Sequence, residues 1–274
     1  MPRPTKHEET RMPKKSLREE VKDLRRQLVS LQERLETIEE IEEEHPARVM
    51  TYIEGFDDLI GGGIPKGHVC LLSGPSGTMK TTIALNMLCK NSTNGLKALY
   101  VTLEETKKSL IGTTEFLCAD FDPDFIVDIG RLRTEHEEVE ETGNWIEVLK
   151  AFISKRKRYR RIELLAIDSL TALYALADLE HPHREMFRLF AFLRDLDITT
   201  IFISDLAADS RFPNQEDSIA DGAIHVDYLQ GSDGSVVITI RCVKLRHSEH
   251  SMDYHRLSFK NGEFSIGPLP NNSL

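Results

Sequence analysis

Two patterns of apolar positions divide the chain. Between Leu17 and Ile38 the apolar residues recur at alternating spacings of four and three, which is the a/d pattern of a heptad repeat. A single helix cannot bury such a narrow apolar stripe on its own surface. Residues 16–45 are therefore predicted to form a helix that pairs with another helix through residues 17–38. The alternative is a helix that folds back on its own domain. The polar residues 1–15 have no periodicity and are predicted to be disordered.

A second pattern begins after this arm. Short apolar runs alternate with segments of helical spacing, and the predicted strands are His68–Ser73, Lys97–Leu103, Phe125–Ile129, Ile162–Ile167 and Thr199–Ser204. Strands that are apolar on both faces and separated by helices are typical of parallel sheets. The chain is therefore predicted to be an α/β protein, with a mainly parallel central sheet and helices on both faces.

The pattern changes again after about Ile219. Three closely spaced segments are strand-like, and glycine-containing turns separate them: Ala223–Leu229, Ser235–Leu245 and Tyr254–Phe259. Such closely spaced strands predict an antiparallel extension of the sheet. Thr51–Gly67 contains three successive glycines and a proline, and it is predicted to be a turn.

The arm and the core are predicted to be separate domains. The dipeptide His45-Pro46 ends the arm helix, because a residue before proline avoids the α conformation. The core domain is predicted to cover residues 49–267, with a tail over 268–274.

Composition narrows the classes of function. No apolar run is long enough to span a bilayer, and the N-terminus lacks the apolar core of a secretory signal. The four cysteines are scattered singly, which indicates buried thiols in a cytoplasmic protein. The net charge of −10 disfavours broad binding to nucleic acid, although the run Lys155–Arg161, with Tyr159 within it, is locally basic. The alternative for that run is a solvated helix end whose cations complement the helix dipole.

The strongest chemical signal follows the first core strand. The segment from Gly74 to Thr82 reads GPSGTMKTT and lies between a predicted strand and a predicted helix. This is the layout of a phosphate-binding P-loop, or Walker A motif, in which backbone N–H groups and a helix N-terminus face an anion. Lys80 would contact the terminal phosphates and Thr81 would bind Mg²⁺, while Met79 stands where the motif has its second glycine. The predicted nucleotide contacts are Gly74, Pro75, Ser76, Gly77, Thr78, Met79, Lys80, Thr81 and Thr82.

Carboxylates end two later strands. Asp168 follows an apolar run and is the candidate second residue of the metal site, although a lone Asp there could equally be a helix N-cap. Glu104 and Glu105 follow the strand after the P-loop helix, at the sheet edge where α/β proteins bind ligands. They are candidates for the group that activates water, and the alternative is an acidic pair opening a helix.

Several motifs together resemble a known family. In chain order they read GFDDLIGGGIPKG, GPSGTMKTT, YVTLEE, LLAIDSL, SIADGAI and VKLRHSEH. Their order and spacing over about residues 49–267 resemble the KaiC/RadA-like ATPases of the RecA superfamily. The chain looks like a single-domain archaeal-type KaiC-like protein, so a RecA-like P-loop NTPase fold is expected.

The resemblance implies more than the spacing does. It implies that ATP is the ligand and that the pair Glu104 and Glu105 holds the catalytic carboxylate. These residues join Lys80 as catalytic candidates, beside the Mg²⁺ site of Thr81 and Asp168 that the P-loop pattern indicates. It also implies that Lys244 and Arg246 reach the neighbouring subunit's phosphate, usually in a hexameric ring. His247 departs from the family, which commonly has glycine there.

Three functions are compatible with the sequence. The first is a Mg-ATP-hydrolysing regulatory ATPase that assembles through ATP-bridged interfaces. The second is a DNA-recombination mediator resembling RadA paralogues, which the acidic balance disfavours. The third is a nucleotide-gated scaffold with little hydrolysis. Ser218 lies near the autophosphorylation region of KaiC, so autokinase activity stays open.

Overall fold

The structure is a computed structural model. It describes residues 26–27, 47–118, 122–129, 145–177, 179–206, 212–231 and 234–270. Contacts divide the chain between Ala47 and Arg48, and the described fold follows that division. The predicted disordered segment and the predicted coiled coil over 17–38 lie outside the described residues, apart from the helical pair Arg26 and Gln27. Within the described ranges, no helix has both the length and the apolar character that a membrane crossing requires.

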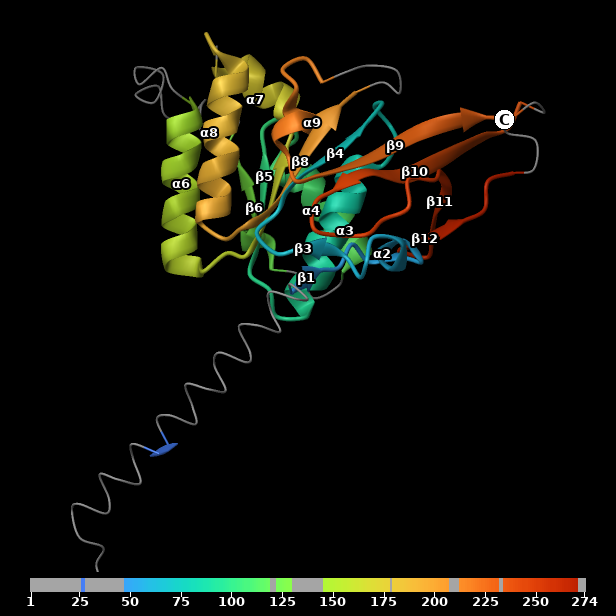
Figure 1. The fold of residues 1–274 in the computed structure, drawn as a ribbon, viewed down its shortest axis with the longest axis horizontal. Helices are drawn as coiled ribbons and strands as arrows, with labels where there is room; N and C mark the ends of the chain where they lie inside the picture. The colour runs from blue at the N-terminus through green and yellow to red at the C-terminus, as the bar shows by residue number, and fades with distance from the viewer. Residues whose placement is uncertain are drawn as a thin grey trace, which may run out of the picture. The chain divides into compact units, whose positions relative to one another are not determined.

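Ten of the described strands form one sheet (Figure 1), in the order β2-β12-β11-β10-β9-β4-β8-β7-β5-β6. Six neighbouring strands run parallel: β4 (Val69–Gly74), β5 (Ala98–Thr102), β6 (Ile126–Asp128), β7 (Leu164–Asp168), β8 (Thr199–Asp205) and β9 (Gly222–Gln230). All residues of β4 and β7 are buried, as expected for strands covered on both faces. The parallel sheet places the ends of β4, β5, β7 and β8 at one edge, where α/β proteins bind ligands.

The C-terminal strands extend the sheet in antiparallel fashion, as predicted. They are β10 (Val236–Leu245), β11 (His255–Lys260) and β12 (Glu263–Gly267). The two-residue strand β2 (Ile53–Glu54) pairs in parallel with β12 and closes that side.

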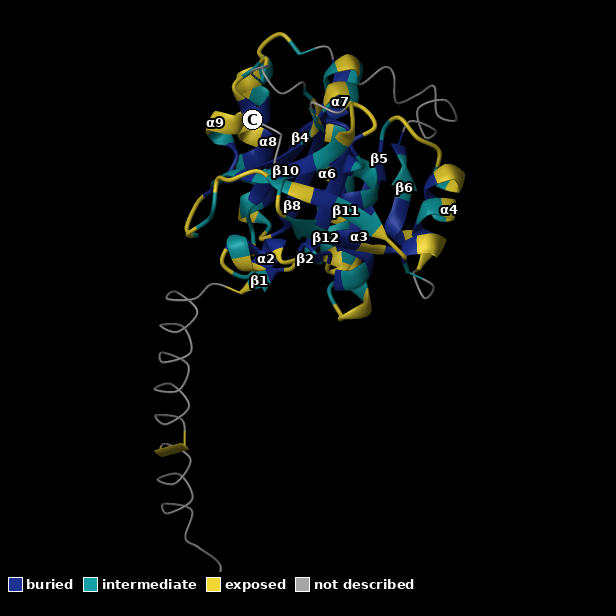
Figure 2. Cartoon of the chain, turned by 90° about the vertical axis from the view of Figure 1, so that its right-hand side faces the viewer, coloured by how far each residue is buried: buried dark blue, intermediate teal, exposed yellow. Residues whose placement is uncertain are grey.

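Helices cover both faces of the sheet, which confirms the predicted fold class. On one face lie α3 (Lys80–Thr93) and α4 (Lys107–Leu117), and on the other lie α6 (Trp145–Arg160), α7 (Leu170–Ala177) and α8 (Pro182–Asp195) (Figure 1). Each face therefore buries its own apolar cluster against the sheet. Figure 2 shows the buried residues concentrated along the central strands and the exposed residues on the outer helix surfaces.

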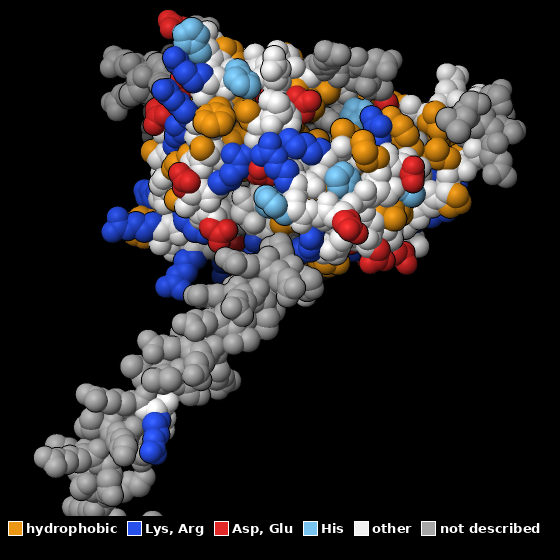
Figure 3. Space-filling view, in the orientation of Figure 1, with side chains coloured by type: hydrophobic (Ala, Val, Ile, Leu, Met, Phe, Trp, Pro, Cys, Tyr) orange, Lys and Arg blue, Asp and Glu red, His pale blue; other side chains and the backbone are white. Residues whose placement is uncertain are grey.

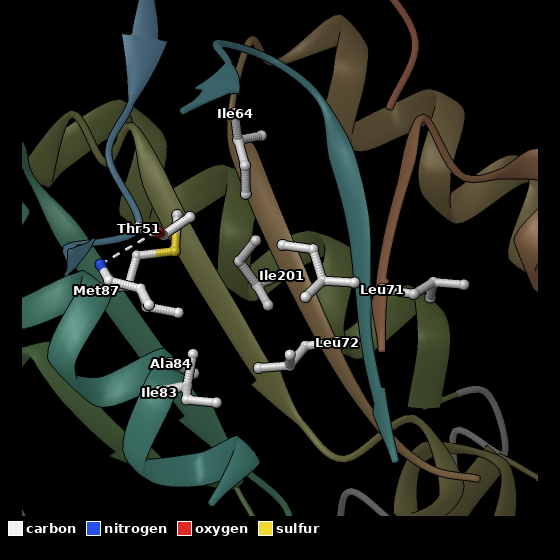
Figure 4. Close-up of a pocket in the computed structure, with 10 residues that line it drawn as sticks. Thr51, Ile64, Leu71, Leu72, Ile83, Ala84, Met87 and Ile201 are labelled. Carbon is white, nitrogen blue, oxygen red and sulfur yellow. Dashed lines mark hydrogen bonds between the residues drawn. The ribbon is translucent and has the colours of Figure 1, made fainter. Parts of the chain in front are cut away.

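The packing of α3 against the sheet leaves one small pocket. It has a volume of about 10 Å³, room for roughly one water molecule. Ile83, Ala84 and Met87 of α3 line it from one side, and Leu72 and Ile201 line it from the strands (Figure 4). Because this lining is apolar, the pocket belongs to the core that supports α3.

The segment Thr51–Gly67 differs from its prediction as a turn. The glycines at 61–63 do have positive φ angles, as a turn requires. However, Phe56–Leu59 forms helix α2, and Ile64–Pro65 forms strand β3, which pairs with β1 (Arg48–Val49). The Arg48 side chain stabilises this pairing by donating to the carbonyl oxygen of Gly63 at 2.8 Å. Three further short elements were not predicted: α7, α9 (Glu216–Ile219) and the 3₁₀ helix η1 (Pro123–Phe125).

Candidate functional site

The P-loop connects β4 to α3 and requires glycine at two positions. A Cβ atom at Gly74 would overlap the backbone carbonyl oxygen of Val226 on β9. Gly77 has a φ of 85°, and a Cβ there would lie 2.5 Å from the Tyr228 hydroxyl oxygen. The Tyr228 hydroxyl donates to the carbonyl oxygen of Ser76 at 3.2 Å. Strand β9 thus supports the loop from behind and sets its curvature.

Met79 occupies the last loop position in a left-handed conformation. It is the N-cap residue of α3, with φ 64° and ψ 21°, and no side chain caps the helix there. A side chain in this conformation costs about 1–2 kcal/mol, so the loop keeps the backbone of a glycine residue despite carrying methionine. Met79 also packs partly against the core cluster beneath α3.

This geometry predicts an inverted order of stability at residue 79. We expect Met79→Gly to be about 1 kcal/mol more stable than Met79→Ala, because both lose the same packing but only alanine retains a Cβ at positive φ. Thr82, in the first turn of the same helix, is the control: there Thr82→Ala should be more stable than Thr82→Gly by about 1 kcal/mol. Urea unfolding of the four variants measures both differences. The same order at both positions would contradict the left-handed assignment of Met79.

Lys80 is buried at the start of α3 and has two partners. Its ammonium group donates to the carbonyl oxygen of Pro75 at 2.8 Å and forms an ion pair with Asp205 Oδ1 at 2.8 Å. Asp205 is the last residue of β8 and pairs with Gly74 across the two strands. Only 6% of the lysine side chain is exposed, against 49% for Asp205. The Lys80 ammonium group thus lies between the loop and the Asp205 carboxylate. That carboxylate occupies the side from which a phosphate would approach.

The predicted metal residues lie in contact. Thr81 Oγ1 donates to Asp168 Oδ2 at 2.7 Å, and the Tyr100 hydroxyl donates to the same oxygen at 2.5 Å. Burial raises the pKa of Asp168, and the two hydrogen bonds oppose that rise by favouring the charged form. A threonine hydroxyl next to a strand-end carboxylate is an oxygen donor set that suits Mg²⁺.

The two glutamates after β5 have different surroundings. Glu104 Oε1 accepts a hydrogen bond of 2.6 Å from Ser169 Oγ, directly after Asp168. Glu105 Oε2 accepts from Ser109 Oγ at 3.0 Å and so lies along the first turn of α4. Glu104 is therefore the glutamate held next to the predicted metal residue Asp168, a distinction that the sequence did not provide.

These groups line a single pocket of about 360 Å³ at the carboxyl edge of the sheet. Its lining residues are Ser76, Gly77, Met79, Lys80, Thr81, Thr82, Glu104, Glu105, Asp168, Ile203 and Asp205. The volume lies in the range of pockets that hold small ligands. The structure thus brings together the candidates from the P-loop, β5 and β7.

Lys244 and Arg246 lie elsewhere in the chain, at the opposite edge of the sheet. Lys244 pairs with Ala223 near the start of β9, and the backbone N–H of Arg246 donates to Asp221. The six residues of β4 place this edge about 17 Å from Gly74. Within one chain, therefore, neither cation reaches the pocket.

The two cations also differ in their partners. The Lys244 ammonium donates to the carbonyl oxygens of Ala220 at 2.7 Å and Asp217 at 2.8 Å, so it holds α9. Arg246 pairs with Asp221 at 3.2 Å, and 45% of its side chain is exposed. Figure 3 shows lysine, arginine and histidine side chains gathered in the middle of the face that carries α9 and β10. Arg246 is the better placed of the two to meet another molecule.

His247 is a second position at which a side chain replaces the expected glycine. Its φ angle is 56°, so it too keeps a left-handed backbone. Its ring packs edge-on against His68, with ring centroids 5.6 Å apart.

Ser218, the candidate for autophosphorylation, lies in α9, and its hydroxyl donates to the carbonyl oxygen of Gln215 at 2.7 Å.

Three contacts of this site were missed from the sequence: Tyr100 to Asp168, Asp205 to Lys80, and Tyr228 to the P-loop. Tyr100 lies within a predicted strand, where an aromatic residue is normally interpreted as part of the hydrophobic core. Asp205 directly follows the predicted strand Thr199–Ser204, and nothing in the sequence indicates that it pairs with Lys80. Only strand order and register identify these partners.

Comparison with known proteins shows which family the chain resembles. A family model described as "ATPase: KaiC" matches residues 49–270. The chain is 30% identical over 239 residues to the circadian clock oscillator protein KaiC of Picosynechococcus sp., a match covering 81% of this chain and 45% of that protein. It is also 30% identical to the KaiC protein of Acaryochloris marina, covering 81% of this chain and 44% of that one. The match thus spans less than half the length of these relatives.

A solved structure is similar in fold. It is that of a KaiC-like protein from the hyperthermophilic archaeon Pyrococcus horikoshii OT3, with a TM-score of 0.68 and 25% identity. The match covers 81% of this chain and 100% of that one.

Proposed function

Because the chain belongs to the KaiC family of ATPases, we propose that it binds Mg-ATP in the pocket at the carboxyl edge and hydrolyses it to ADP and phosphate. The observation that carries this proposal is the convergence of a buried lysine, a threonine–aspartate pair and a glutamate on one pocket. The lysine and the threonine begin α3, the aspartate ends β7 and the glutamate follows β5, and each has the chemistry that phosphoryl transfer requires.

The roles of the chain's residues follow from their contacts. The backbone of the loop from Gly74 to Met79 surrounds the phosphates, and Lys80 leaves Asp205 to contact the terminal phosphate. Glu104 is held by Ser169 at the side of the pocket next to Asp168, where it accepts the proton of the attacking water. Glu105 lies against the first turn of α4, where it accepts from the Ser109 hydroxyl and contributes negative charge.

The donor set fits Mg²⁺. Thr81 and Asp168 would hold it through hydroxyl and carboxylate oxygens, with Tyr100 fixing the carboxylate. Among the described residues, no cluster of three or more His, Cys, Asp or Glu side chains could hold a metal, which agrees with an ion that completes its coordination with substrate oxygens and water. When bound, Mg²⁺ neutralises charge on the transferring phosphoryl group.

We further propose that ATP bridges two copies of the chain. Arg246 lies about 17 Å from the pocket of its own chain and is partly exposed, so it would meet the pocket of a neighbour. A cation supplied by a neighbour stabilises the charge of phosphoryl transfer and links turnover to assembly. Such a head-to-tail interface closes into a ring, for which a hexamer is the favoured size. The relatives are named as clock oscillator proteins. For this chain we propose a regulatory role in which ATP turnover at the shared interface controls assembly.

A mixing experiment tests the shared site. Arg246→Ala and Lys80→Ala should each lower turnover strongly when pure, the first for lack of the neighbour's cation and the second for lack of its own phosphate lysine. In a 1:1 mixture, about a quarter of the interfaces would combine an intact pocket with an intact arginine, so phosphate release should recover to roughly that fraction. Asp221 keeps its 2.7 Å contact with Arg194 in the Arg246 variant, which protects the fold. A mixture that stays inactive would place the whole site within one chain.

The proposed activity itself is tested by phosphate release and mass photometry with and without Mg-ATP. We expect turnover that EDTA abolishes, and larger assemblies when ATP is present. Assembly with ATP but without phosphate release would instead indicate a nucleotide-gated scaffold. Transfer of labelled phosphate to Ser218 would add an autokinase activity.

A further inference from the structure

The C-terminal end of α6 carries an unusual concentration of positive charge. Six of the seven residues from Lys155 to Arg161 are lysine or arginine, in a chain whose net charge is −10. Across the described part of the chain, none of these six side chains forms an ion pair with a carboxylate. Other cations, such as Lys90, Arg188 and Arg194, do form such pairs. Figure 3 shows basic side chains projecting over this end of α6, at the lower left.

An exposed aromatic ring lies among these cations. Tyr159 is 70% exposed, and the guanidinium of Arg158 lies 5.8 Å from its ring centroid. Because the ring is largely exposed, it contributes little to the buried core. An exposed ring among arginines that form no ion pair with a described carboxylate offers a flat surface together with positive charge, the combination on which bases stack.

A pocket of about 350 Å³ adjoins this surface. Arg156, Tyr159 and Arg160 form its basic wall. Its remaining lining comes from Ser92, Lys97, Ala98, Leu99, Asp122, Asp124, Phe125 and Ile162. The pocket therefore combines an apolar floor, two guanidinium groups and two carboxylates. It suits a ligand that has an anionic part, a flat apolar part and hydrogen-bond donors.

We propose that this surface, Lys155–Arg161 with the adjoining pocket, binds single-stranded nucleic acid. Phosphates would lie along the cations of this surface, a base would stack on Tyr159, and Asp122 or Asp124 would accept from the amino groups of a base in the pocket. An acidic peptide would match the cations, but its carboxylate side chains have no flat apolar part to stack on Tyr159 and no amino group to donate to the two aspartates. A free mononucleotide would leave most of the six cations without an anionic partner.

The surface is separate from the ATP pocket. Ala98 and Leu99 begin β5, whereas Glu104 follows its end, so the two sites lie at opposite edges of the sheet. Substitutions in the basic surface should therefore leave ATP turnover unchanged. The two activities can be measured independently on the same variants.

The test is fluorescence anisotropy of a labelled single strand of about 20 nucleotides with the full chain, between about 50 and about 200 mM salt. We expect Arg158→Ala/Arg160→Ala to raise Kd at least 10-fold and to reduce the salt slope by roughly 2. The matched control is Arg184→Ala/Arg188→Ala, which removes the same charge from α8, where both arginines contact Glu185. It should change Kd less than about 2-fold.

Tyr159→Ala separates stacking from charge. It should weaken binding about 5- to 10-fold at every salt concentration without changing the slope, and Tyr159→Phe should restore binding. Absence of binding by the parent chain at low salt would overturn the proposal. So would an equal loss in the α8 control, or binding of a duplex as tightly as of the single strand.

Discussion

Glu104→Gln is expected to lower ATP turnover by about 10²- to 10⁴-fold while ATP still binds. Glutamine keeps the carbonyl oxygen that accepts from Ser169 at 2.6 Å, so the side chain should stay in position. It cannot accept a proton from water. The loss should therefore fall on kcat, and binding should tighten slightly because a negative charge next to the phosphates is removed.

The matched variant is Glu105→Gln, one residue along the same segment. Its carboxylate contacts Ser109 at 3.0 Å and lies along α4, so its loss should reduce turnover by about 10-fold or less. Phosphate release under saturating Mg-ATP, together with binding of a fluorescent ATP analogue, measures both quantities. A larger loss in Glu105→Gln would assign the base to the other glutamate.

The parallel strands were predictable because a strand that is buried on both faces needs an unbroken run of apolar residues. Exposed segments of the chain lack such runs. Ile162–Ile167 and Thr199–Ser204 correspond closely to β7 and β8. The short elements were not predictable in the same way. Strand β3 exists because Arg48 and Val49 pair with it, and two residues carry no periodicity of their own. Helix α7 is only eight residues long, and its apolar residues read equally well as a loop against the core.

The candidate site shows a similar division. Lys80, Thr81 and Asp168 follow from residue type and position after a strand, because P-loop chemistry fixes both. Side-chain partners do not follow from spacing. The contact between Tyr100 and Asp168 joins residues 68 positions apart, and it exists because β5 and β7 are neighbours in register. The sequence likewise left open which conformation Met79 adopts, since the backbone at that position depends on how β9 supports the loop.

The ion pair between Lys80 and Asp205 leads to the second large effect. Lys80→Ala should weaken ATP binding at least 100-fold, equivalent to about 2.7 kcal/mol, because it removes the cation nearest the phosphates and leaves Asp205 facing them without its partner. Lys90→Ala is the control on the same helix, since Lys90 contacts Glu263 at 3.1 Å away from the pocket, and it should leave binding unchanged. Isothermal titration calorimetry with ATP measures the affinities. Equal binding by Lys80→Ala and the parent chain would show that the phosphate site is assigned wrongly.

Asp205→Asn should act in the opposite direction. In the structure Asp205 holds Lys80 at 2.8 Å, so ATP has to displace a carboxylate from the lysine before its phosphate can bind. Asparagine removes that competition and one negative charge at the pocket, and we expect ATP to bind about 10-fold more tightly. In Lys80→Ala/Asp205→Asn the combined change should differ from the sum of the single changes, because the two side chains are in direct contact. Additive effects, or weaker binding by Asp205→Asn, would instead mean that Asp205 helps to position the lysine for phosphate rather than competing for it.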